Sequence, residues 1–141
     1  MKSVASDGPA ETERLAAELA KRLVPGDVVL IEGELGAGKT TFVRGALRAL
    51  GVTEPVVSPT FTIGRRYAGS VPISHLDLYR LGDLEGEDPG LLDDYVDADR
   101  VTFVEWPAVA EGSIGSVVAR VRIDHAGGDD RLIAIRVGPS S

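Results

Sequence analysis

The glycine-rich segment Gly33-Glu34-Leu35-Gly36-Ala37-Gly38-Lys39-Thr40 has residue types and spacing suited to holding a phosphate group. Its glycines let the backbone curl around phosphate oxygens, and Lys39 supplies a positive charge for the β- and γ-phosphates. The hydroxyl of Thr40 can ligate Mg²⁺, and Thr41 is placed to reach the α-phosphate. The acid Glu34 is expected to turn its side chain away from the phosphates. The segment therefore predicts a binding loop for a magnesium nucleotide, ATP, rather than an ordinary glycine turn.

The elements on either side of this loop support the prediction. The run Val28-Val29-Leu30-Ile31 is apolar on both faces, which is typical of a strand buried in a parallel sheet. Residues 41–50 carry apolar side chains at helical spacing, and Gly51 is a natural helix end. A loop between a strand and a helix directs backbone N–H groups and the positive end of the helix dipole at one anion.

Two acidic residues at predicted strand ends are candidate partners for the metal. Alternation in His75-Leu76-Asp77-Leu78-Tyr79 places His75, Asp77 and Tyr79 on one face of a strand. Glu105 follows the apolar run Val101-Thr102-Phe103-Val104. Phosphate loops need an acid at the end of a neighbouring strand, which favours a functional role for both. The alternative for each is a solvated strand end, and the sequence leaves open which of the two ligates Mg²⁺ directly.

Three further side chains have a functional and a structural interpretation. Thr60, in Ser58-Pro59-Thr60-Phe61, follows the loop helix where phosphate-loop proteins often sense the γ-phosphate, or it belongs to an ordinary loop. Trp106 is the single tryptophan, and a lone aromatic residue is more often core than ligand platform. His75 is more often a hydrogen-bonded structural residue than a base.

The other segments predict the remaining scaffold. Residues 10–24 form an apolar helical stripe that ends at Pro25-Gly26, and residues 62–67 and 71–79 form two strands joined by a turn. A short helix is expected within the acidic segment 82–100. Residues 117–123 and 132–137 flank Gly127-Gly128-Asp129-Asp130 and predict an antiparallel hairpin. The 141 residues suffice for a single domain, with an ordered core over about 10–137.

Composition excludes several classes of function. The net charge of −7 argues against direct binding to DNA or RNA, which requires a basic face. The absence of cysteine and the presence of only two histidines leave little for a zinc site, so any metal is expected to have oxygen ligands. No apolar run reaches the roughly 18–20 residues of a membrane helix, and the start lacks a signal peptide. A soluble, cytoplasmic protein is expected.

The motifs taken together resemble a known family. The phosphate loop, Ser58-Pro59-Thr60-Phe61, His75-Leu76-Asp77-Leu78-Tyr79-Arg80-Leu81 and Val104-Glu105-Trp106-Pro107 are similar in order and spacing to the bacterial ATPases of tRNA threonylcarbamoyladenosine biosynthesis, the TsaE family, formerly called YjeE. The resemblance spans about residues 10–137. It implies an α/β, P-loop NTPase-like fold of three layers, with a mixed, mostly parallel sheet and a C-terminal antiparallel hairpin.

The resemblance also implies partners and site residues. The family works with the proteins TsaB and TsaD, and it meets tRNA only indirectly through that complex. Lys39 and Thr40 match the family's phosphate and magnesium residues, and Asp77 and Glu105 match its metal-site acids. The remaining matches are a switch-like threonine (Thr60), a tryptophan beside the metal site (Trp106), a threonine near the adenine (Thr12) and a late-strand arginine that approaches the nucleotide (Arg131). Ala108 stands where the family commonly has an acid, so any role of that acid does not carry over.

Two other functions remain open from the residues. A small-molecule kinase would need an acceptor pocket and an arginine-bearing lid, and no segment suggests such a lid. A nucleotide-controlled interaction module would use ATP to order a surface and hydrolysis to release it. The ATPase itself is expected to be slow alone and stimulated by its partners.

Overall fold

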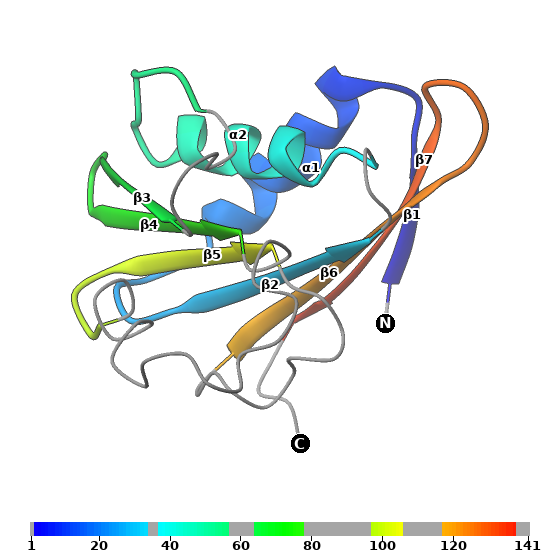
Figure 1. Ribbon diagram of the computed structural model, residues 1–141. Coiled ribbons are helices and arrows are strands. Elements are labelled where there is room, and N and C mark those ends of the chain that lie inside the picture. The colour runs from blue at the N-terminus through cyan, green and yellow to red at the C-terminus, as the bar shows by residue number, and fades with distance from the viewer. Residues whose placement is uncertain (1, 34–36, 57–63, 78–96, 106–116, 138–141) are drawn as a thin grey trace, which may run out of the picture.

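The computed structural model describes residues 2–33, 37–56, 64–77, 97–105 and 117–137. Within these ranges the chain forms two helices and seven strands (Figure 1). In chain order they are β1 (Lys2–Ser6), α1 (Pro9–Ala20), β2 (Val28–Gly33), α2 (Lys39–Ala49), β3 (Gly64–Ala68), β4 (Pro72–Asp77), β5 (Val101–Glu105), β6 (Val117–His125) and β7 (Arg131–Val137).

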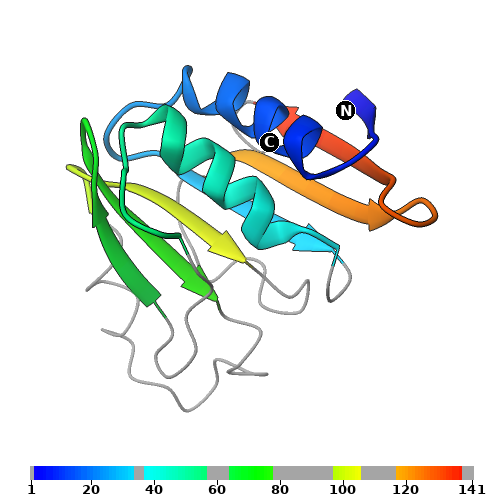
Figure 2. The same cartoon turned by 90° about the horizontal axis from the view of Figure 1, so that it is seen from above.

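The seven strands form one mixed sheet in the order β1-β7-β6-β2-β5-β4-β3. The four central strands β6, β2, β5 and β4 run parallel, while β3 and the pair β7 and β1 add antiparallel edges. This arrangement confirms the predicted α/β class, the mixed sheet and the C-terminal hairpin. Both helices lie over the same face of the sheet, as Figure 2 shows from above. A second helical layer is not seen in the described ranges.

The helices and the sheet enclose the core because each contributes an apolar face. The first four residues of β2 and all five of β5 are buried, as expected for central parallel strands. α1 and α2 pack against each other and turn their apolar stripes to the sheet. The largest fully buried side chains of this core are Phe42, Leu47, Phe103, Ile31, Ile73 and Ile123.

The observed elements differ from the predicted ones at two places. The predicted helix over residues 10–24 ends at Ala20, because the chain continues in tighter turns in which Arg22 N–H donates to Leu19 and Leu23 N–H donates to Ala20. β1 lies outside the segments that the sequence pattern predicts. It pairs antiparallel with β7 and extends the sheet at its edge. The short helix expected within residues 82–100 falls almost entirely outside the described residues. Neither described helix is long and apolar enough to cross a membrane.

Candidate functional site

A strand and a helix flank the predicted phosphate loop, as the sequence predicts. β2 ends at Gly33, and α2 begins at Lys39 directly after Gly38, which caps the helix with φ of +103°. Gly33 has φ of +152°, and a Cβ there would lie 2.1 Å from the Ile123 carbonyl oxygen. Only glycine fits both backbone positions, because other residues are strained at such φ values. The loop residues Glu34, Leu35 and Gly36 lie outside the described ranges.

Lys39, in the first turn of α2, is buried beside the two candidate acids. Its ammonium group donates a hydrogen bond to the Gly33 carbonyl oxygen at 3.1 Å, so the side chain reaches back to the end of β2. Burial lowers the pKa of Lys39, while the negative charges of Glu105 and Asp77 act in the opposite direction. A buried cation at a helix N-terminus is a strong attractor for an anion.

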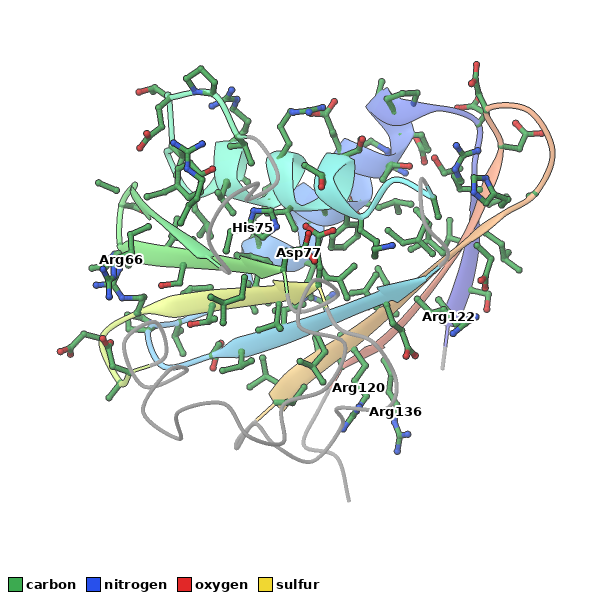
Figure 3. All side chains as sticks on the ribbon, viewed as in Figure 1. Arg66, His75, Asp77, Arg120, Arg122 and Arg136 are labelled. Atoms are coloured by element: carbon green, nitrogen blue, oxygen red, sulfur yellow. The ribbon has the colours of Figure 1, made fainter. Side chains whose placement is uncertain are left out.

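Asp77 and Glu105 come together at the carboxyl ends of the parallel strands. They are register partners in β4 and β5, and Glu105 is in turn the partner of Ile31 in β2. Register partners point to the same face of a sheet. That face is the one that α2 covers, and Figure 3 shows Asp77 on the α2 side of β4. The structure therefore brings both predicted acids to the edge where the phosphate loop begins.

Thr40 completes a set of oxygen donors with these acids. Its hydroxyl donates to Glu105 Oε2 at 3.3 Å, and Glu105 is only 4% exposed. A hydroxyl and one or two carboxylates suit Mg²⁺, which usually takes its remaining ligands from water and substrate phosphates. In the described part of the chain, no three side chains of histidine, cysteine, aspartate or glutamate gather as a metal cluster, so the site would depend on water and phosphate oxygens for its remaining ligands. The donor set thus fits the predicted metal.

Arg131, at the start of β7, links the phosphate loop to a cavity. Its Nε donates to the Ala37 carbonyl oxygen at 2.9 Å, and its Nη1 donates to the carbonyls of Gly128 and Asp130, both at 2.8 Å. Beside it lies a cavity of about 610 Å³ between β1, the start of α1 and the β6–β7 turn. This volume is within the range of small-molecule sites. The predicted nucleotide arginine thus touches both the loop and a space large enough for a ligand.

Thr12 lies next to this cavity but does not line it. Its hydroxyl is 2.8 Å from the Ser6 hydroxyl, which lines the cavity and donates to the Gly8 carbonyl at 2.9 Å. Because Ser6 has only one hydroxyl proton, Thr12 is the donor in this pair. Thr12 is 2% exposed, so its hydroxyl ties α1 to β1. Its predicted position near an adenine stays a prediction.

Three more predicted residues stand as follows. Thr41 is half-buried in the first turn of α2, beside Thr40. Thr60 and Trp106 lie outside the described ranges, so their predicted roles stay predictions.

The family model "Threonylcarbamoyl adenosine biosynthesis protein TsaE" matches residues 6–133. The chain belongs to the TsaE family. A TsaE relative from Bacillus subtilis is 44% identical over 126 residues, covering 89% of this chain and 78% of the relative. A TsaE relative from Streptomyces coelicolor is 43% identical over 121 residues, covering 82% of this chain and 80% of the relative. Both relatives are described as tRNA threonylcarbamoyladenosine biosynthesis proteins.

The TsaE fold is also supported by a solved structure. The crystal structure of YdiB from Bacillus subtilis matches this chain with a TM-score of 0.79 and 34% identity, covering 99% of this chain and 86% of that one. The family resemblance stated from the motifs is therefore confirmed, and so is the α/β, P-loop NTPase-like fold that it implies.

Two residues that lie beside the candidate site were not predicted to contribute to it. Ser6 lies in the unpredicted strand β1, where no motif marks it. His75 was interpreted as a hydrogen-bonded structural residue, and its Nε2 lies 2.5 Å from Glu105 Oε2. The signal for His75 was its alternation with Asp77, since residues two apart on a strand share a face.

Proposed function

We propose that this chain is a Mg²⁺-dependent P-loop ATPase that supports threonylcarbamoyladenosine modification of tRNA by acting on a complex of TsaB and TsaD. Membership of the TsaE family supports the place in tRNA threonylcarbamoyladenosine biosynthesis. The nucleotide, the metal and the two partners are inferred from the chemistry of the site and from the family resemblance.

The hydrogen bond from Thr40 to Glu105 is the observation that carries the proposal. A hydroxyl can donate its proton to a carboxylate while a lone pair of its oxygen ligates a metal. Thr40 can therefore bind Mg²⁺ and keep its hydrogen bond to Glu105 at the same time. Asp77 lies beside Glu105 in the neighbouring strand. Together the three residues can hold Mg²⁺ and orient an attacking water, as phosphoryl transfer requires.

The surroundings of this donor set suit a nucleoside triphosphate. Lys39 and the N-terminus of α2 present positive charge to the phosphates. The cavity beside Arg131 lies at the other side of the loop, and its volume of about 610 Å³ can accept a nucleoside. A nucleotide whose phosphates bind at Lys39 and whose base occupies this cavity would reach across the loop.

The partner dependence follows from what the site contains. Catalysis of phosphoryl transfer depends on positioned charge and on exclusion of water. The guanidinium of Arg131 donates to three backbone carbonyls through Nε and Nη1, so moving it onto a transition state would break these hydrogen bonds. A partner surface that closes over the site would supply the missing charge and exclude water.

The Thr40→Ala variant is expected to lose about tenfold or more in ATP affinity in the presence of Mg²⁺, because it removes a metal ligand. In excess chelator the same variant should bind ATP nearly as the wild-type chain does. Isothermal titration calorimetry in both conditions measures the two affinities. Thr40→Ser keeps the hydroxyl and serves as the matched control, with affinity close to wild type.

Equal losses with and without Mg²⁺ would mean that the Thr40 hydroxyl serves the loop structure rather than the metal. A wild-type chain that gives no binding heat with Mg²⁺ and ATP would overturn the proposed function itself.

A further inference from the structure

A histidine lies in the core beside the candidate metal site. His75, in β4, is fully buried, and its Nε2 lies 2.5 Å from Glu105 Oε2. Burying an imidazole costs free energy unless it is hydrogen-bonded, and an apolar side chain would fill the same core position without that cost. A contact to Glu105 is therefore the feature that distinguishes histidine from leucine at this position.

The surroundings of His75 determine where its proton lies. The Nδ1 atom is buried and has no hydrogen-bond partner among the residues that the structure describes. A buried N–H without an acceptor is more costly than a buried lone pair without a donor, which places the single proton of a neutral ring on Nε2. Nε2–H then donates to the Glu105 carboxylate.

Within the described residues, Thr40 and His75 contact the same oxygen of Glu105. The Thr40 hydroxyl and His75 Nε2 each contact Oε2, so neither contact uses Oε1. His75 lies in β4, two residues before Asp77 on the same face of the strand (Figure 3), and Asp77 is the register partner of Glu105. Two hydrogen bonds to one oxygen restrict the rotation of the carboxylate, so the direction of its second oxygen is also fixed.

We infer that His75 is a positioning residue, which fixes the Glu105 carboxylate so that its other oxygen can orient water or magnesium-bound water during ATP hydrolysis. The inference rests on the proposed function. When Thr40 also ligates Mg²⁺, the position of its hydroxyl depends on the bound nucleotide. The hydrogen bond from His75 comes from strand β4 of the sheet, so it holds Glu105 independently of the nucleotide. His75 acts on the reaction only through Glu105.

The test is a double-mutant cycle between His75 and Glu105. Phosphate release is measured in the complex with TsaB and TsaD for the wild-type chain and for His75→Leu, Glu105→Gln and the double variant. His75→Leu should lower kcat about tenfold or more, with KM for ATP changed less than about threefold. In the Glu105→Gln background the same change should alter kcat less than about twofold.

Two further variants separate positioning from packing. His75→Gln carries an amide N–H close to the place of Nε2, so it should recover most of the lost rate. Ser74→Ala alters the neighbouring buried polar residue of β4, which faces the opposite side of the sheet, and it should leave kcat unchanged. Circular dichroism of each variant checks that the fold is intact.

The outcomes distinguish this inference from the proposed function. Normal hydrolysis by the wild-type complex, with an equal loss from His75→Leu in both backgrounds, would overturn the positioning role alone. A wild-type rate in His75→Leu would do the same. A wild-type complex that does not hydrolyse ATP would refute the proposed function and this inference together.

Discussion

Replacing Lys39 by alanine is expected to lower the affinity for ATP by about a hundredfold or more. The ammonium group is a buried positive charge at the start of α2. In its proposed role it binds the β- and γ-phosphates, and hydrogen bonds between charged groups contribute about 1.5–3 kcal/mol each. Because burial lowers the pKa of Lys39, the folded chain gains no stability from the charge itself. The fold should therefore survive the substitution, and calorimetric titration with Mg²⁺ and ATP measures the loss.

Lys21→Ala is the matched control for this experiment. Lys21 caps the C-terminal end of α1 and is exposed, so its removal changes the net charge equally without touching the loop. ATP affinity in this variant should equal that of the wild-type chain. Unchanged affinity in Lys39→Ala would refute the assignment of the phosphate loop.

Glu105→Gln and Asp77→Asn are expected to reduce ATP hydrolysis about a hundredfold or more in the complex with TsaB and TsaD. Each substitution keeps the shape of the side chain and removes the charge that organises Mg²⁺ and the attacking water. The two carboxylates are adjacent at the edge of the sheet where the loop begins, so both are within the same site. Phosphate release measures the rates. Titration with Mg²⁺ shows which of the two variants also loses metal affinity, and the residue replaced in that variant is then the direct ligand.

Glu32→Gln is the control for these acids. Glu32 lies near the same end of β2 but is the register partner of Arg122, on the face turned away from α2. Its removal should leave hydrolysis unchanged. If Glu105→Gln or Asp77→Asn hydrolyses ATP at the wild-type rate, that residue is a strand end without a catalytic role.

The sequence predicted the parts of the site that depend on local patterns. The glycine spacing, the apolar run before it and the helical spacing after it identify β2, the loop and α2, because each is set by residues close together in the chain. Alternation likewise places His75 and Asp77 on one face of β4, and their register partners Phe103 and Glu105 confirm it.

What the sequence could not predict depends on strand order. Asp77 and Glu105 become neighbours only because β5 inserts between β2 and β4, which no local pattern encodes. β1 is short and pairs with β7 at the other end of the chain, so its stability as a strand comes from a distant partner. The contact between His75 and Glu105 depends on the same strand order. Residues such as Thr60 and Trp106, outside the described ranges, are known only from their motifs.

We propose that the isolated chain hydrolyses ATP slowly and that its partners complete the site. The most direct test is steady-state phosphate release from the purified chain at fixed Mg²⁺ and ATP, titrated with the TsaB–TsaD pair and with no small-molecule acceptor. We expect slow release from the chain alone and a clear, saturable increase as the pair is added. Fast release from the chain alone that the pair leaves unchanged, or no release under any condition, would contradict it.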